Sequence, residues 1–236
     1  MLVIEGLTKT YKNGKKAVDS LSLEIKPGEI YGFIGHNGAG KTTTMKCVVG
    51  ILRFEAGNIF VNGRSVRDEP IECKRDAAFI PDSPDLYLNM TGIKYLKFVA
   101  DVCGLDQSKR ESGIGKYAEV LELTTNLGDL VSSYSHGMKQ KLALISALMR
   151  EPKLLILDEP FVGLDPKAAF TLKEQLRALC ARGGAVFFST HILEVAEKLC
   201  DKIAIIKNGK LIKSGTTAAV RGDKSLENLF LELTEQ

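Results

Sequence analysis

The nine residues GHNGAGKTT at positions 35–43 constrain the fold of this chain more than any other stretch. They follow Glu29 to Ile34, whose apolar residues suggest a short buried strand, and they lead into a segment, Lys41 to Val49, that can form a helix. A loop of the pattern G-x-x-x-x-G-K-[ST] between a strand and a helix is the arrangement of a phosphate-binding loop. The sequence therefore predicts an anion site at the end of a buried strand.

The residue types in this loop suit a phosphate group. The glycines permit backbone conformations in which successive N–H groups turn inward, and the helix N-terminus adds a partial positive charge. Lys41 adds a full charge, worth on the order of 4 kcal/mol against a phosphate oxygen at about 4 Å in an intermediate dielectric. Thr42 offers a hydroxyl oxygen to Mg²⁺, and Thr43 can donate to a more internal phosphate. The predicted binding residues of the loop are Gly35, His36, Asn37, Gly38, Ala39, Gly40, Lys41, Thr42 and Thr43. A glycine-rich turn that binds nothing is the alternative, but such a turn does not require Lys and Thr.

Composition narrows the class of protein. A chain of 236 residues with 44% hydrophobic residues can bury a substantial core, and a net charge of +3 gives no argument for a nucleic-acid partner. The five cysteines include no C-x-x-C pair, so they predict neither a disulfide framework nor a zinc site, and a reducing cytosol is the simplest interpretation. We find no signal peptide and no apolar run long enough to span a bilayer. Any membrane role is therefore expected to come through another chain.

A second group of chemically informative residues is LLILDEP at 154–160. Four large apolar residues bring two adjacent carboxylates to the carboxyl end of a buried strand, where open α/β sheets bind ligands. Adjacent strand residues point to opposite faces, so the two acids are expected to have different roles. Asp158 can hold Mg²⁺, and Glu159 can accept a proton from an attacking water. The alternative is a strand that ends in two solvated acids.

Strands and helices alternate along most of the chain. Leu2 to Tyr11 and Ala17 to Ile25 alternate apolar and polar residues as paired strands do, and strands resume after residue 151 between helical segments. Residues 85–150 instead carry apolar residues at helical spacing without a convincing strand. Alternation of this kind predicts an α/β protein with a mainly parallel sheet covered on both faces. We expect residues 1–84 and 151–236 to form the core, and residues 85–150 to form an inserted helical subdomain.

Several motifs together indicate a family. GHNGAGKTT, LLILDEP, GLDP at 163–166 and His191 after an apolar strand occur in this order, and the chain thereby resembles the ATP-binding subunit of an ABC transporter. The resemblance covers almost the whole chain. It implies one ABC ATPase domain, residues 1–236, with a RecA-like P-loop NTPase core, an antiparallel β-subdomain and an inserted α-helical subdomain.

The resemblance also implies roles for residues outside the phosphate loop. Tyr11 matches the aromatic residue that stacks on adenine. Ser135, His136, Gly137 and Met138 occupy the place of the signature loop, which caps the γ-phosphate held by the opposite subunit. Asp165 matches the loop that couples the two sites across the dimer, and His191 matches the switch histidine that contacts the γ-phosphate and the attacking water.

Two positions depart from the usual family pattern. Of the usual signature of leucine, serine, two glycines and glutamine, only Ser135 and Gly137 match. Asp82 stands where the family usually has a glutamine that touches Mg²⁺ and senses the transmembrane partner. Aspartate also offers an oxygen, although it is shorter, charged and unable to donate when ionised. We expect Asp82 to reach Mg²⁺, directly or through water.

The resemblance therefore implies an ATPase whose cofactors are ATP and Mg²⁺. We expect it to pair in the ATP-bound state, as a homodimer or with a second ATPase subunit, and to drive a separate transmembrane permease from the cytoplasmic face of the membrane. The YSHGMKQ segment at 134–140, the Ile80-Pro81-Asp82 segment and the short C-terminus resemble the ATPases of bacterial multidrug and antibiotic exporters more than those of nutrient importers. A soluble ABC ATPase with a non-transport role and a nucleotide-binding regulatory module with little turnover remain alternatives. A small-molecule kinase would share the phosphate loop but would have no reason for the signature loop or His191. The sequence does not identify the transported substrate.

Overall fold

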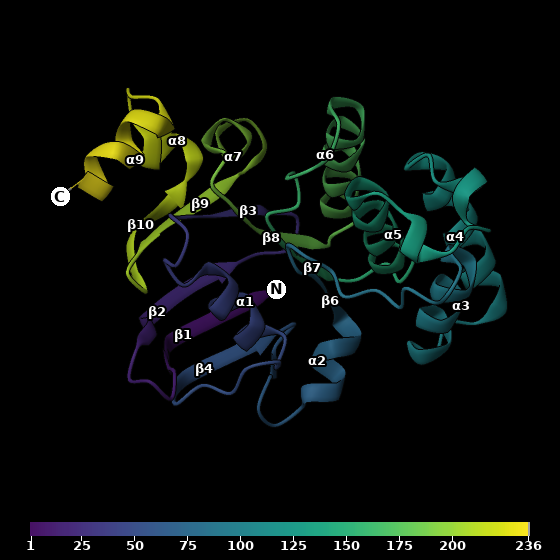
Figure 1. Ribbon diagram of the computed structural model, residues 1–236. Helices are drawn as coiled ribbons and strands as arrows, with labels where there is room; N and C mark the ends of the chain where they lie inside the picture. The colour runs from purple at the N-terminus through teal and green to yellow at the C-terminus, as the bar shows by residue number, and fades with distance from the viewer. Residues whose placement is uncertain (236) are drawn as a thin grey trace.

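Two sheets and a set of covering helices make up the structure, a computed structural model that describes residues 1–235 (Figure 1). The larger sheet has the strand order β10-β9-β3-β8-β7-β6, and the smaller has the order β2-β1-β4-β5. The larger sheet comprises β3 (Ile30–Ile34), β6 (Ala77–Ile80), β7 (Leu154–Asp158), β8 (Ala185–Thr190), β9 (Lys202–Lys207) and β10 (Lys210–Thr216). The smaller comprises β1 (Leu2–Thr10), β2 (Lys16–Ile25), β4 (Ala56–Val61) and β5 (Arg64–Ser65).

The larger sheet is parallel except at one edge. β3, β6, β7, β8 and β9 pair in parallel, and β10 returns antiparallel to β9. Every residue of β3, β7 and β8 is buried, as expected for strands covered on both faces. The predicted α/β class with a mainly parallel sheet is confirmed, and the parallel strands bring the ends of β3, β7 and β8 to one edge.

The smaller sheet is antiparallel throughout. The alternating apolar residues of β1 and β2, among them Leu2, Ile4, Leu21 and Leu23, face a core that also contains Met45 from α1 (Lys41–Val48). This core continues into one face of the parallel sheet through Phe33 and its neighbours. The N-terminal sheet therefore packs beside the phosphate loop rather than forming a separate domain.

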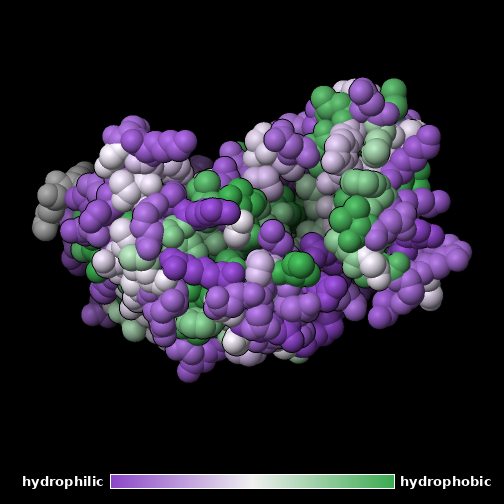
Figure 2. Space-filling model, turned by 90° about the horizontal axis from the view of Figure 1, so that it is seen from below, coloured by the Kyte–Doolittle hydropathy of each residue, from purple (hydrophilic) through white to green (hydrophobic). Residues whose placement is uncertain are grey.

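Helices from the middle of the chain pack on the other side of the parallel sheet. α3 (Gly92–Val102), α4 (Gln107–Val120) and α5 (His136–Leu148) lie together at the right of Figure 1. Figure 2 shows that the surface is hollowed between this helical part and the sheet-bearing part. The remaining helices are α2 (Pro70–Asp76), α6 (Pro166–Ala181), α7 (Leu193–Leu199), α8 (Thr217–Arg221) and α9 (Leu226–Glu235), with 3-10 turns at Thr124–Asn126 and Val131–Ser133. In residues 1–235 no helix is long and apolar enough to cross a membrane.

Candidate functional site

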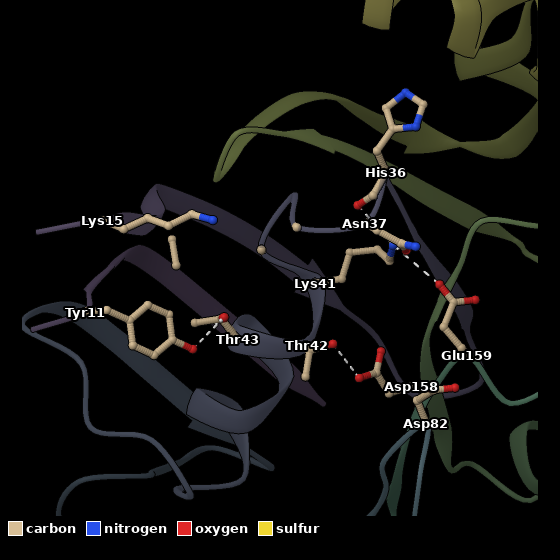
Figure 3. A pocket seen from close by; sticks show the side chains of 13 residues that line it. Tyr11, Lys15, His36, Asn37, Lys41, Thr42, Thr43, Asp82, Asp158 and Glu159 are labelled. Atoms are coloured by element: carbon tan, nitrogen blue, oxygen red, sulfur yellow. Dashed lines mark hydrogen bonds and ion pairs between the residues drawn. The ribbon is translucent and has the colours of Figure 1, made fainter. Parts of the chain in front are cut away.

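The phosphate loop lies between β3 and α1, at the edge where β7 also ends. A cleft of ≈ 240 Å³ opens there (Figure 3). It brings together the predicted residues Tyr11, His36, Asn37, Gly38, Gly40, Lys41, Thr42, Thr43, Asp82, Asp158 and Glu159. Gly35 and Ala39 are buried members of the same loop. Residues separated by more than 100 positions thus converge on one cavity, because parallel strands end at a common edge.

Two loop glycines are required by close backbone packing. A Cβ at Gly40 would lie 2.4 Å from the Ala17 carbonyl oxygen, and its φ of 110° also disfavours other residues. A Cβ at Gly35 would lie 2.6 Å from the Ile206 carbonyl oxygen. The loop is therefore held tightly between β2 and β9.

Lys41 is a buried cation, 6% exposed, that lies against its own loop. Its Nζ donates to the carbonyl oxygen of Gly35 at 2.6 Å and to that of His36 at 3.4 Å. It also forms an ion pair with Glu159 Oε1 at 3.4 Å. The oxygens of a phosphate group in the cleft would replace the Glu159 carboxylate as the partner of Lys41. The ammonium group is therefore already in place for an anion.

Asp158 is held by two hydroxyl groups. Thr42 Oγ1 donates to Asp158 Oδ2 at 2.6 Å, and Ser189 Oγ donates to Asp158 Oδ1 at 2.5 Å. The carboxylate is only 3% exposed, so these donors fix its orientation toward the cleft. Asp82 lines the same cleft. The donor set is a hydroxyl and two carboxylates, which are the hard oxygen ligands that Mg²⁺ prefers.

Glu159 has an unusual backbone and a constrained side chain. Its φ is 50°, and its N–H donates to Ser189 Oγ at 3.0 Å. Its Oε2 accepts the His191 N–H at 3.2 Å and lies 2.9 Å from His191 Nδ1. Its Oε1 is buried and accepts no hydrogen bond within the described part of the chain; it faces Lys41. His191 thus fixes one carboxylate oxygen of Glu159. The other oxygen can accept a proton once Lys41 pairs with a bound anion instead of with Glu159.

Tyr11 stands at the outer end of the cleft. Its hydroxyl shares a hydrogen bond with Thr43 Oγ1 at 3.0 Å, which fixes the ring beside the start of α1. The residue is 40% exposed, so the ring can offer a face to a planar ligand. Its role in stacking on adenine stays a prediction.

The predicted signature segment does not line this cleft. Ser135 caps α5, where its Oγ accepts the Met138 N–H at 3.2 Å, and the residue is exposed. The His136 ring packs on the backbone of Gly163, where a Cβ would lie 2.6 Å from His136 Cδ2. The α5 N-terminus therefore presents its N–H groups to the surface rather than to the Lys41 cleft.

Asp165 also lies outside the cleft. Its Oδ1 accepts the Ala168 N–H at 2.8 Å and caps α6. This backbone hydrogen bond, together with the charge of Lys141, lowers the pKa of Asp165. The side chain therefore stays ionised at neutral pH and stabilises the first turn of the helix.

Sequence reasoning missed two polar residues of the site. Ser189 is fully buried and joins Asp158 to Glu159, and Lys15 lines the cleft near Tyr11. A polar residue at the end of the apolar strand 185–188 was the available signal for Ser189. Lys15 had none, because its position depends on how β1 and β2 fold over the phosphate loop.

Comparison with known proteins identifies the family. The family model described as ABC transporter matches residues 18–162. A solved structure titled as the ATP-binding subunit of an ABC transporter has a TM-score of 0.94 and 34% identity, covering 99% of both chains. This chain belongs to the ABC transporter family. The predicted family, the P-loop NTPase fold and the ATPase activity are thereby confirmed, and the chain is an ATP-binding subunit of a transporter.

Two further proteins resemble this ABC transporter subunit, one in sequence and one in fold. The Nod factor export ATP-binding protein I of Burkholderia pseudomallei is 36% identical over 85% of this chain and 66% of its own length. The fold is shared by a dimeric ATP-binding cassette in a post-hydrolysis state bound to ADP and Pi, at a TM-score of 0.84 and 23% identity, covering 92% of this chain and 99% of that one.

Proposed function

We propose that two ATPase subunits close around two Mg-ATP and that this closure drives a separate transmembrane permease in the direction of export. The pair would consist of two copies of this chain, or of one copy with a second ATPase subunit. The observation that carries the proposal is the division of the site. Lys41, Asp158 and Glu159 share one cleft, whereas Ser135 lies exposed outside it. One chain therefore holds only part of the predicted contacts to ATP.

The cleft accounts for the first part of the site. Loop N–H groups and Lys41 would hold the phosphates, Thr43 would donate to a more internal phosphate, and Tyr11 would stack on the base. The exposed ring of Tyr11 and the buried ammonium of Lys41 lie along one continuous cavity, which supports this order of contacts. When no anion is bound, the Glu159 carboxylate neutralises the charge of Lys41. A bound phosphate would take over this role.

Thr42, Asp158 and Asp82 would hold Mg²⁺ together with phosphate oxygens. Among residues 1–235 no cluster of three or more His, Cys, Asp or Glu side chains could hold a metal ion. This fits a metal that arrives with the nucleotide, because Mg²⁺ in such sites is bound by one or two carboxylates plus phosphate oxygens. Bound there, Mg²⁺ would supply Lewis-acid stabilisation of the phosphate oxygens.

Hydrolysis would depend on Glu159, with His191 and Lys41 beside it. Glu159 Oε2 faces His191, which fixes the carboxylate, and Oε1 is released when Lys41 turns to the phosphate. The released oxygen would accept a proton from the water that attacks the γ-phosphate. His191 would hold that water and the phosphate, and Lys41 would stabilise the phosphate charge.

The second part of the site would come from the opposing chain. Ser135 through Met138 present a serine hydroxyl and the N–H groups of the α5 N-terminus, a combination suited to a phosphate. The contact between His136 and Gly163 ties this segment to the loop that precedes Asp165, which supports a coupling role for that loop. Residues 85–150 would move as one subdomain against the core formed by 1–84 and 151–236.

The direction of transport and the membrane location are parts of this proposal. The relative named for Nod factor export supports an exporter. The family resemblance supports a subunit that works at the cytoplasmic face, bound to its permease. In native cells we expect it to sediment with membranes and to be released by alkaline carbonate, whereas the purified chain should not bind protein-free vesicles.

The catalytic assignment is tested by Glu159→Gln. The variant should keep ATP affinity and lose hydrolysis by about 10²–10⁴-fold, the usual contribution of a general base. Glu119→Gln, an exposed carboxylate on α4, is the matched control and should hydrolyse ATP at the wild-type rate. A Glu159→Gln protein that hydrolyses ATP as fast as the wild type would rule out the assignment.

A further inference from the structure

The C-terminal helix α9 reaches the phosphate loop. The ring of Phe230 packs on the ring of His36, with centroids 4.7 Å apart at an interplanar angle of 55°. Figure 3 shows the His36 side chain pointing away from the cleft, opposite to Lys41. The imidazole therefore faces α9, and the role given above to the loop backbone does not use it.

The backbone of His36 is part of the phosphate loop. Its carbonyl oxygen accepts the Ala39 N–H at 3.1 Å, which closes the turn of the loop. The same oxygen lies 3.4 Å from Lys41 Nζ. The position of His36 thus affects both the curvature of the loop and the placement of its cation.

α9 is itself firmly attached to the core. Phe230 is 7% exposed, and Leu226 at the start of the helix is fully buried. The Leu226 N–H donates to Glu197 Oε2 at 3.0 Å, a bond that lowers the pKa of Glu197. Near the other end, Lys207 Nζ donates to the Leu233 carbonyl oxygen at 3.4 Å. Phe230 is therefore a fixed support rather than a mobile side chain.

We propose that Phe230 is a positioning residue for ATP binding: through the His36 ring it holds the phosphate loop in the conformation that accepts phosphate. The inference rests on the nucleotide site proposed above and adds an element that lies outside the cleft. When the loop is fixed in advance, ATP binding does not have to order it, so affinity is higher. Without the ring contact, part of the binding free energy is spent on ordering the loop.

The expected effect follows from the strength of an aromatic pair. Such pairs contribute enough to change an equilibrium by about two- to tenfold. Phe230→Leu keeps an apolar side chain in place and removes the ring, so it should fold and bind Mg-ATP about two- to tenfold more weakly. KM for ATP should rise by the same factor while kcat changes less than about twofold, since the groups that perform hydrolysis are untouched.

Two controls separate positioning from general packing. Leu229→Val removes a methylene from the neighbouring buried residue of α9 and does not alter the Phe230 ring, so it should lower the melting temperature without changing ATP affinity. His36→Ala removes the other ring and should weaken ATP binding about as much as Phe230→Leu. The double variant should bind no more weakly than the weaker single variant, because both changes remove one contact.

Titration of Mg-ATP into the full chain and these variants decides the matter. Wild-type affinity in Phe230→Leu, equal loss in Leu229→Val, or additive losses in the double variant would each overturn the inference. A wild-type chain that binds no Mg-ATP would instead refute the proposed function. A loss confined to the Phe230 and His36 variants, and non-additive between them, would support the inference.

Discussion

Ser189 joins the two acids of the site, and replacing it with alanine tests how the site is held. Its hydroxyl donates to Asp158 Oδ1 and accepts the Glu159 N–H at 3.0 Å, and the residue is fully buried. In Ser189→Ala the buried carboxylate loses one of its two hydroxyl donors, and a backbone N–H loses its acceptor. A hydrogen bond to a charged group contributes about 1.5–3 kcal/mol, and an unsatisfied buried group costs about 1–3 kcal/mol.

Because the two losses share one atom and water can replace part of them, we expect the free energy of unfolding to fall by about 3 kcal/mol in total. Activity should fall as well, since Asp158 and Glu159 lose their common anchor; a cost of about 1.4 kcal/mol in the transition state is a tenfold lower kcat. Urea unfolding measures the first effect and steady-state ATP hydrolysis the second. Ser146→Ala removes a hydroxyl that donates to the Ala143 carbonyl on its own helix, and it should cost less than about 1 kcal/mol and leave hydrolysis unchanged.

A Ser189→Ala protein with wild-type stability and wild-type hydrolysis would refute this reasoning. Loss of stability with normal hydrolysis would show that Ser189 supports the fold but does not position the two acids. Binding of Mg-ATP by each variant should be measured in parallel, so that a fall in kcat is not confused with weak binding.

Three more predictions follow from other parts of the chain. In nucleotide titrations, Tyr11→Ala should weaken ATP and GTP binding by similar factors and Tyr11→Phe should not, because stacking uses the ring. Equal losses in both variants would instead implicate the hydrogen bond between the Tyr11 hydroxyl and Thr43. Burial raises the pKa of Cys47 to about 11 and that of Cys180 to about 12. At pH 8 a thiol reagent should therefore modify the partly exposed Cys103 rapidly, while mass spectrometry should find Cys47 and Cys180 unmodified. Burial alone would raise the pKa of Asp76, but hydrogen bonds from Asn62 and Lys153 and neighbouring positive charges outweigh burial and lower it. The stability that Asp76 contributes is therefore present above its unfolded pKa and is lost as pH falls through its folded pKa. Asp76→Asn should accordingly flatten the acid side of a curve of unfolding free energy against pH.

The parallel sheet could be predicted because its signals are local. The apolar runs 154–157 and 185–188 each appear in the structure as buried strands, and the loop at 35–43 connects a strand to a helix as expected. These segments are recognisable since strands buried on both faces are apolar at consecutive positions. Their order in the sheet depends on long-range pairing, which the pattern alone does not encode.

Short and polar elements were harder to predict. The helix at Pro70–Asp76 was missed because it has only seven residues and buries only Cys73. Within the helical segment expected at 85–150, the start of α4 (Gln107–Val120) depends on Asp106, which caps the helix by accepting the Lys109 N–H. Capping signals of this kind are weaker than apolar periodicity in a mainly polar segment.

The candidate site shows a similar division. Lys41, Thr42, Asp158 and Glu159 were found from their motifs, and the structure brings all four to one cleft. The pairing of His191 with Glu159 and the role of Ser189 between the acids depend on which strands are neighbours. The contact of Phe230 with His36 joins residues almost 200 positions apart, and nothing in either local segment predicts it.

Sedimentation of the Glu159→Gln protein with and without Mg-ATP reports whether two chains share the ATP site. We expect a monomer without nucleotide and a dimer with Mg-ATP, and we expect that adding Ser135→Ala abolishes the dimer while ATP still binds. A protein that binds Mg-ATP yet stays monomeric, or a dimer that forms equally well without Ser135, would contradict the shared site.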